Sequence, residues 1–205
     1  MQKSPKSLSI IGSTGSIGTQ SLGIVRARPA DFNIKALSAG NNLELLIEQI
    51  KEFKPEYVTI SSDEHREELH KLFPEIKILR DVEELAALDV DICLSAIVGI
   101  AGLKANLIAL EHAKKLAIAN KETLVAAGHL VNEKIKKFNS ELIPVDSEHA
   151  AIHHALCGYD VSKVKEILLT ASGGPFRTRT LDELKTVTVK DALKHPNWDM
   201  GAKIT

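Results

Sequence analysis

Up to about residue 141 the sequence alternates short apolar runs with longer stretches of helical periodicity. The runs are brief and β-branched or aliphatic, as strands that are buried on both faces require. Strands that alternate with helices form parallel sheets with crossover helices. The expected strands cover residues 8–11, 34–38, 57–60, 76–79, 92–95 and 116–119. This rhythm predicts a doubly wound, Rossmann-like α/β domain over residues 1–141.

A second unit is expected from residue 142. A strand over residues 142–145 leads into Asp146-Ser147-Glu148 and a helix, and a further strand is expected over residues 166–170. Residues 195–203 have the composition of a functional loop with nothing folded behind it. We therefore expect residues 142–205 to be the truncated beginning of a second α/β catalytic domain.

Composition argues against several classes of protein. Lysine and arginine total 26 against 27 aspartate and glutamate, so the formal net charge of -1 provides no basic field for nucleic acid or anionic lipid. The N-terminus lacks the long apolar core of a signal peptide or membrane span, and we expect a cytoplasmic protein without a nucleic-acid or membrane partner. Cys93 and Cys157 lie far apart in apolar contexts, so a disulfide framework and a CxxC metal site are both excluded, and two buried thiols are expected.

The first expected strand runs into Gly12-Ser13-Thr14-Gly15-Ser16-Ile17-Gly18, and a helical pattern follows over residues 19–27. Glycines let the backbone turn sharply and approach a pyrophosphate, whose charge is attracted by the free amides of a helix N-terminus. The Gly-x-x-Gly-x-x-Gly spacing departs from the commoner Gly-x-Gly-x-x-Gly, and the position between strand and helix is what favours a dinucleotide. A glycine-rich turn without a ligand is the alternative.

The tip of the second strand favours NADP over NAD. An NAD site places an acidic residue about 20 positions beyond the glycines, on the ribose 2′-hydroxyl, but residues 37–42 contain no carboxylate. A 2′-phosphate would meet no repulsion there, and it could accept from the amides of Gly40 and Asn41 and from the side chains of Ser38, Asn41 and Asn42. Capping of the next helix by Asn41 or Asn42 is the alternative, and capping is compatible with phosphate contact.

Asp146 and Glu148 form a candidate metal pair. On an extended segment residues two apart project to one side, so the two carboxylates can converge on a hard cation such as Mg²⁺ or Mn²⁺. The alternative is a helix N-cap with a first-turn acid. His149 and His153 have the i,i+4 spacing of zinc ligands but lack the glutamate of His-Glu-x-x-His, so together with His154 they are expected to be surface or packing histidines.

Three further stretches contain candidate site residues. Residues 120–122, Asn-Lys-Glu, follow the sixth expected strand, where open α/β sheets bind ligands, and Lys121 is a candidate partner for an anion or carbonyl group. Residues 172–175, Ser-Gly-Gly-Pro, can present amides and a hydroxyl to a phosphate. His195 and Trp198 offer a donor and an aromatic lid. The alternatives are an ordinary helix start, a plain turn, and a surface loop with the tryptophan packed inward.

Together these stretches resemble the 1-deoxy-D-xylulose 5-phosphate reductoisomerase family, and the match extends over essentially the whole chain. The shared motifs, in order, are Gly-Ser-Thr-Gly-Ser-Ile-Gly, Ala-Asn-Lys-Glu, Pro-Val-Asp-Ser-Glu-His, Ser-Gly-Gly-Pro-Phe-Arg and His-Pro-Asn-Trp-x-Met-Gly. The resemblance implies an NADPH- and divalent-metal-dependent enzyme of non-mevalonate isoprenoid biosynthesis. Its reaction would convert 1-deoxy-D-xylulose 5-phosphate to 2-C-methyl-D-erythritol 4-phosphate.

The resemblance also implies a role for each matching residue. NADPH would contact Thr14, Gly15, Ser16, Ile17, Gly40, Asn41, Asn42, Asn120, Glu122 and Gly201. The phosphorylated sugar would contact Lys121, Ser147, Glu148, Ser172, His195, Trp198 and Met200, the last two on a lid. Asp146 and Glu148 would hold Mg²⁺ or Mn²⁺, and Lys121 and His195 would complete the catalytic set. A homodimer is implied for the full-length form.

Members of the family continue beyond this point with further phosphate contacts, a third metal carboxylate and a C-terminal helical domain. We therefore expect the 205-residue chain to be an N-terminal fragment that binds NADPH and has little activity of its own.

Two other functions compete with this interpretation. An NADP-dependent semialdehyde dehydrogenase also opens with Gly-x-x-Gly-x-x-Gly, but it needs a thiolate in a polar pocket, which the apolar contexts of Cys93 and Cys157 do not provide. A non-catalytic dinucleotide-binding module would bind NADPH without any effect of Mg²⁺ or Mn²⁺. The paired acids at 146 and 148 and the loop that begins at His195 argue against that module.

Overall fold

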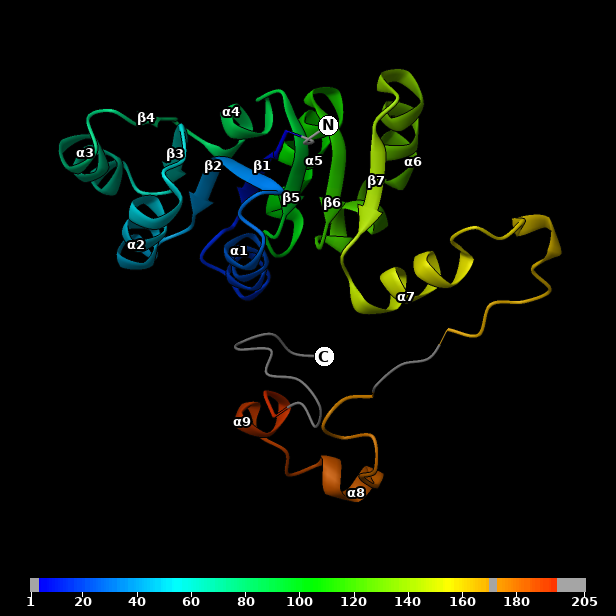
Figure 1. The fold of residues 1–205 in the computed structure, drawn as a ribbon. Helices are drawn as coiled ribbons and strands as arrows, with labels where there is room; N and C mark the ends of the chain where they lie inside the picture. Colours follow the sequence, from blue (N-terminus) through cyan, green and yellow to red (C-terminus); the bar gives the residue numbers. More distant parts are fainter. Residues whose placement is uncertain (1–3, 170–172, 195–205) are drawn as a thin grey trace. The chain divides into compact units, whose positions relative to one another are not determined.

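The computed structural model describes residues 4–169 and 173–194. Its centre is a seven-stranded sheet in which all neighbouring strands are parallel, in the order β4-β3-β2-β1-β5-β6-β7 (Figure 1). The strands are β1 (Lys6–Ile11), β2 (Phe32–Ala39), β3 (Tyr57–Ile60), β4 (Lys77–Ile78), β5 (Val90–Ser95), β6 (Ala113–Ile118) and β7 (Glu141–Pro144). The first seven predicted strands are therefore confirmed, with ends that differ by three residues at most.

Helices cover both faces of the sheet. The helices are α1 (Ser16–Ala27), α2 (Leu43–Phe53), α3 (Asp63–Leu72), α4 (Val82–Ala86), α5 (Leu103–His112), α6 (Lys121–Phe138) and α7 (Ser147–Leu156), with a 3-10 turn η1 (Ile100–Gly102). Leu8 and Ile10 of β1 belong to a core with buried residues of α1, α2 and α3, whereas the adjacent Ile11 belongs to a second core with α4, α5 and α6. The doubly wound, Rossmann-like α/β architecture is confirmed.

Helix α2 illustrates how the local sequence produces these elements. Leu46 and Ile50 lie one turn apart on its inner face and are buried against the sheet, as the apolar spacing predicts. The helix begins where the Asn42 side chain accepts a hydrogen bond from Leu45 N at 3.1 Å, and it ends at Lys54 in the left-handed conformation. The helical spacing of the apolar residues in 43–51 places Gln49 on the polar side, together with Glu44, Glu48 and Lys51. The structure departs from this prediction and buries Gln49.

The chain divides into two compact units, Met1–His154 and Ala155–Thr205, and the first contains the whole sheet. The described part of the second unit contains the 3-10 turn η2 (Val161–Lys163), α8 (Leu181–Leu184), α9 (Val189–Ala192) and no strand. The strand predicted over residues 166–170 is therefore wrong for residues 166–169, and Thr170 lies outside the described residues. Ile167, Leu168 and Leu169 are exposed, since no neighbouring strand supplies the hydrogen-bond ladder that an extended apolar run requires.

Two other features of the chain bear on the sequence predictions. Cys93 is buried as predicted, but Cys157 is exposed and the expectation of two buried thiols is wrong for it, because it follows the last turn of α7, where no residue of the helix is fully buried. Among the described residues, no helix combines the length and the apolar character needed to cross a membrane.

The edge of the sheet opposite the glycine turn contains an ion pair that makes stability depend on pH. Asp91 accepts hydrogen bonds from Ser7 N at 2.9 Å, Ser7 Oγ at 3.0 Å and Lys114 Nζ at 2.7 Å. The hydrogen bond from Lys114, followed by those from Ser7, lowers the pKa of Asp91 to about 2. A folded-state pKa below the unfolded value stabilises the fold above pH ~4, and this stabilisation is lost as the pH falls toward 2.

We therefore expect Asp91→Asn to lower the free energy of unfolding by about 1 to 2 kcal/mol at pH 7. The difference from wild type should shrink steadily between pH ~4 and pH ~2, as measured by urea unfolding at a series of pH values. Asp31→Asn is the control, because it removes only an exposed pair with Arg28 and should cost less than about 0.5 kcal/mol. A difference for Asp91→Asn that stays constant down to pH ~2 would contradict this account.

Candidate dinucleotide and metal site

The carboxyl ends of the strands bring the predicted site residues to one edge of the sheet. Because all strands are parallel, the segments that follow β1, β2, β6 and β7 emerge on the same side, and these segments contain the glycine turn and residues 40–42, 120–122 and 146–148. The strand order reverses at β1, which lies between β2 and β5, and open α/β sheets bind ligands at such a reversal. Three steps between adjacent strands separate β1 from β7, which is roughly 14 Å at the usual spacing.

The turn after β1 is shaped by glycine at two positions. Gly12 has φ +88°, and an added Cβ would lie 3.0 Å from Ala96 O. A Cβ on Gly18 would lie 2.3 Å from Gly12 O and 2.6 Å from Ser13 Cα, so α1 packs directly against the backbone of the turn. No side chain larger than hydrogen fits at Gly18 without displacement of the backbone.

The start of α1 presents free amides at this turn. Gly15 is the N-cap residue and offers no side chain to cap the helix, and the first turn contains no acidic residue. Gly15 and Ser16 are exposed, and Thr14 and Ile17 are partly buried beside them. An uncapped helix N-terminus without a negative neighbour favours a phosphate group.

A buried polar cluster supports the turn from β2 and α2. Ser38 Oγ accepts from Gly12 N at 2.9 Å, and Ser13 Oγ donates to Gln49 Oε1 at 2.7 Å, while Gln49 Nε2 donates to Ser13 O at 3.0 Å. Ser38 is only 1% exposed, so the expectation that its side chain donates to a ligand phosphate is wrong, because the hydroxyl is held beneath the turn. Gln49 is the supporting residue that the sequence pattern missed, because a polar residue on an amphipathic helix usually faces water.

Residues 40–42 remain accessible at the tip of β2. Gly40, Asn41 and Asn42 are all exposed, and the nearest carboxylate along the chain is Glu44, within α2. Asn42 caps α2 through its side-chain oxygen, so helix capping is confirmed for this residue. The cap does not use the side-chain NH₂ of Asn42, and this group can donate a hydrogen bond. Its contact with a 2′-phosphate remains a prediction.

At the end of β6 the three predicted residues have different environments. Asn120 is the N-cap residue of α6 and is 1% exposed, with its side chain turned into the protein, so its predicted contact with NADPH would have to be made through the backbone. Lys121 Nζ lies 2.7 Å from Asp146 Oδ2, which joins the predicted substrate contact to the predicted metal ligand. Glu122 Oε2 accepts from Asn120 Nδ2 at 3.1 Å.

The extended geometry predicted for residues 146–148 is wrong, because α7 begins at Ser147. Ala150 N donates to Asp146 O at 2.8 Å in the helical i,i+4 pattern, so Asp146 precedes the first turn and Glu148 lies within it. The alternative of an acid at a helix start is therefore the observed backbone geometry. Glu148 Oε2 accepts from Ser147 Oγ at 2.7 Å.

The ammonium group of Lys121 favours the ionised form of Asp146. Its side chain is 13% exposed, and His149 Nδ1 lies 3.2 Å from Oδ1 on the side opposite Lys121. Burial raises the pKa of Asp146, but the hydrogen bond and charge of Lys121 outweigh it and the pKa lies below its usual value. The same hydrogen bond raises the pKa of Lys121. Within residues 4–169 and 173–194, no three acidic, histidine or cysteine side chains gather into a metal-binding group.

The structure does not describe all of the predicted site residues. Ser172, His195, Trp198, Met200 and Gly201 lie outside the described residues. His153 and His154 are exposed on α7, as expected for surface histidines.

Burial raises the pKa of the Cys93 thiol to about 12, so this cysteine cannot supply the thiolate that a semialdehyde dehydrogenase needs.

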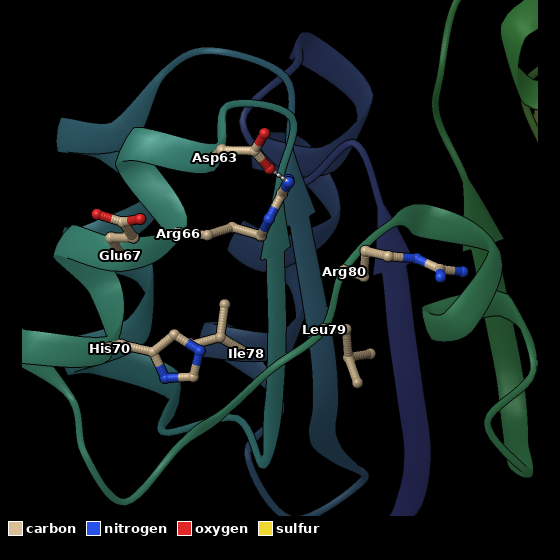
Figure 2. Close-up of a pocket in the computed structure, with 7 residues that line it drawn as sticks. All are labelled: Asp63, Arg66, Glu67, His70, Ile78, Leu79 and Arg80. Carbon is tan, nitrogen blue, oxygen red and sulfur yellow. Dashed lines mark hydrogen bonds and ion pairs between the residues drawn. The ribbon is translucent and has the colours of Figure 1, made fainter.

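A hollow elsewhere on the sheet lies between α3 and the segment from β4 to α4. Figure 2 shows Arg66 and His70 of α3 on one side and Leu79 and Arg80 on the other. The two arginines are already paired, Arg66 with Asp63 and Arg80 with Asp81 at 2.9 Å. Arg66 also donates to the carbonyl oxygen of Ile60, the last residue of β3, at 2.6 Å. This hollow contains none of the predicted site residues.

These observations place the chain among Rossmann-like α/β proteins that have a glycine-rich turn and an acidic pair on the same edge of the sheet. The family model of 1-deoxy-D-xylulose 5-phosphate reductoisomerase matches residues 8–128, and the model of that enzyme's C-terminal domain matches residues 142–205. The chain therefore belongs to the 1-deoxy-D-xylulose 5-phosphate reductoisomerase family, and the resemblance found in the sequence is confirmed.

Individual relatives agree with this assignment. A 1-deoxy-D-xylulose 5-phosphate reductoisomerase of Chlorobaculum tepidum is 50% identical over 206 aligned residues, which cover 98% of this chain and 54% of the relative. The Zymomonas mobilis reductoisomerase in complex with NADPH superposes with a TM-score of 0.86 at 35% identity, covering 94% of this chain and 52% of that one. A reductoisomerase solved with NADPH, fosmidomycin and magnesium gives a TM-score of 0.85 at 35% identity, covering 96% and 52%. The chain thus spans about half the length of the curated relatives it matches.

Proposed function

We propose that this chain provides the NADPH site and part of the metal and substrate site of a 1-deoxy-D-xylulose 5-phosphate reductoisomerase. The whole enzyme would convert this substrate to 2-C-methyl-D-erythritol 4-phosphate in isoprenoid biosynthesis, as a cytoplasmic homodimer. Residues 1–141 would bind the cofactor and residues 142–205 would begin the catalytic domain. Because the chain spans about half the length of its relatives, we expect it to bind NADPH with little turnover.

The observation that carries the proposal is the uncapped start of α1 on the same sheet edge as the Lys121–Asp146 pair. A dinucleotide whose pyrophosphate lies at the glycine turn extends along this edge, and the strand order makes β5, β6 and β7 the strands on one side of that turn. The residues proposed to contact NADPH are Thr14, Gly15, Ser16, Ile17, Gly40, Asn41, Asn42, Asn120, Glu122 and Gly201. Since the Asn120 side chain is buried, its contact would be made through the backbone.

Asp146 and Glu148 are the residues proposed to hold Mg²⁺ or Mn²⁺. Both present hard carboxylate oxygens at the start of α7, which is the donor type that these cations prefer. The cation supplies Lewis acidity to substrate oxygens, and NADPH supplies the hydride. For a cation to use Asp146 Oδ2, Lys121 must release it, and its ammonium group is then available to an oxygen of the substrate. Ser147, Ser172, His195, Trp198 and Met200 complete the proposed substrate site.

Titration with NADPH and with Mn²⁺ tests the two parts of the proposal. We expect saturable NADPH binding by calorimetry and Mn²⁺ binding by electron paramagnetic resonance. Asp146→Ala should weaken Mn²⁺ binding at least about tenfold, since it removes one of two charged ligands, and leave NADPH affinity within about twofold. Asp89→Ala is the matched control, because this exposed acid precedes β5 at the opposite edge of the sheet. NADPH binding that is accompanied by no Mn²⁺ binding would favour the non-catalytic dinucleotide module instead.

A further inference from the structure

A buried polar cluster connects α5 to the start of α6. Asn106 of α5 and Asn120 and Thr123 at the start of α6 are each no more than 1% exposed. Asn106 Nδ2 donates to Thr123 Oγ1 at 2.8 Å and to Asn120 Oδ1 at 3.2 Å. None of the predictions from sequence involves Asn106, whose neighbours along α5 are mainly apolar.

The side chain of Asn120 has no hydrogen-bonding capacity left for a ligand. Its Nδ2 donates to Ile97 O at 2.8 Å, Gly99 O at 2.7 Å and Glu122 Oε2 at 3.1 Å, which more than occupies two hydrogens. Its Oδ1 accepts from Asn106 Nδ2 and from the backbone N–H and hydroxyl of Thr123. The Thr123 N–H can only donate, and this fixes which end of the amide faces α6.

The two acceptors at Ile97 and Gly99 belong to the loop that follows β5. Asn120 therefore joins this loop to α6, and Asn106 holds Asn120 from the α5 side. The contact is close, because a Cβ on Gly102 would lie 3.2 Å from Asn120 Cγ. The cluster thus links the end of β5, α5 and α6 at the edge of the sheet where the cofactor is proposed to lie.

Asn106 does not have the environment of a residue that serves only the stability of the fold. Its Oδ1 is buried without a hydrogen-bond partner among the described residues. An amide oxygen left unpaired in the interior is destabilising, and an apolar side chain of similar size would avoid this cost. What an apolar side chain could not provide is the pair of donors directed at Asn120 and Thr123.

The backbone of α6 makes this local restraint important. The helix is interrupted at Ala127, which has φ -142° and ψ 31°. Residues 121–126 are consequently not stiffened by an unbroken helical ladder into the rest of α6. Lys121 and Glu122 belong to this first segment, so their positions depend on how its N-terminal end is held.

We infer that Asn106 is a positioning residue, which fixes the first segment of α6 and thereby places Lys121 and Glu122 for the cofactor and substrate. The effect on NADPH rests on the proposed function, whereas the effect on the order of α6 does not. If loosening reduces the binding-competent population to about one tenth, the apparent Kd for NADPH rises about tenfold.

The test compares Asn106→Leu with wild type in the full 205-residue chain. We expect Asn106→Leu to raise the Kd for NADPH about tenfold and to leave the Tm within about 2 °C. Amide hydrogen exchange at Thr123 should become about tenfold faster, while exchange in β1 stays unchanged. Asn106→Ala is the second variant if the leucine variant fails to fold.

Ser140→Ala is the matched control. Ser140 is also buried and also bonds to α5, donating to Leu110 O at 2.7 Å, but it precedes β7 at the opposite edge of the sheet. We expect this control to lower the Tm by about 2 to 4 °C with no change in NADPH affinity.

Two results would overturn the inference. One is wild-type NADPH affinity together with wild-type exchange at Thr123 in the Asn106 variants. The other is an equal loss of affinity in Ser140→Ala, because that would indicate general softening of the fold. If the wild-type chain itself binds no NADPH, the proposed function fails, and the exchange rate at Thr123 alone decides whether Asn106 positions α6.

Discussion

Gly18→Ala is expected to abolish measurable NADPH binding and to destabilise the fold. The new Cβ would lie 2.3 Å from Gly12 O and 2.6 Å from Ser13 O, and both are backbone atoms that cannot rotate away. Either α1 moves outward or the turn opens, at a cost of about 3 kcal/mol. Displacement of the turn would remove about two of the amide contacts proposed for the pyrophosphate, which corresponds to a loss of affinity of more than about a hundredfold.

The measurements are urea unfolding and fluorescence titration with NADPH. Gly23→Ala is the matched control, because it makes the same substitution in the same helix at a position where the added Cβ meets no atom within 4 Å. This control should stabilise the chain by about 0.5 to 1 kcal/mol through helix propensity and leave NADPH affinity unchanged. Gly18→Ala with normal stability and normal affinity would show that α1 does not need its close approach to the turn.

Asn41→Asp is expected to abolish the preference for NADPH over NADH. Wild type should bind NADPH about tenfold to a hundredfold more tightly than NADH, since exposed residues 40–42 offer donors and no negative charge to a 2′-phosphate. A carboxylate at position 41 repels this phosphate and can accept from a 2′-hydroxyl. We expect NADPH affinity to fall about tenfold to a hundredfold, while NADH affinity is unchanged or improved.

Calorimetric titration with each cofactor measures this change. Asn33→Asp is the control, because Asn33 is exposed at the start of β2, whereas Asn41 follows its end, and both variants undergo the same change in charge. It should alter the ratio of the two affinities by less than about twofold. If wild type prefers NADH, or if Asn33→Asp has the same effect as Asn41→Asp, the assignment of residues 40–42 to the 2′-phosphate is wrong.

The fold was largely predictable from the sequence because its strands are short apolar runs buried on both faces. Eight runs were predicted on this description, and the first seven are strands in one parallel sheet. The run over residues 166–169 has the same composition and is not a strand, because a run becomes a strand only where another strand pairs with it. The composition of a segment indicates its conformational preference, whereas strand formation also requires a second strand beside it.

The site was predictable in its residue types and less so in its geometry. The glycine turn follows β1 as expected, but the reason for Gly18 is its contact with Gly12, which no spacing rule contains. The local pattern around Asp146 suggested an extended pair of acids, and the structure has a helix start instead. Asp146 is paired with Lys121, which lies 25 residues away in the sequence. Lys121 begins the helix after β6, and β6 is the strand next to β7, which precedes Asp146.

The parallel α/β class, the turn between β1 and α1 and the lack of a carboxylate at the tip of β2 all follow from the amino-acid pattern. Periodicity of apolar residues and the conformational demands of glycine are local properties, and a linear pattern expresses them directly. Four features could be recognised only in the folded chain: the strand order, the burial of Ser38 and Gln49 beneath the turn, the ion pair at Asp146 and the cluster around Asn106. Each of these depends on contacts between segments far apart in the chain, whose free energies are set by packing and desolvation in the assembled fold.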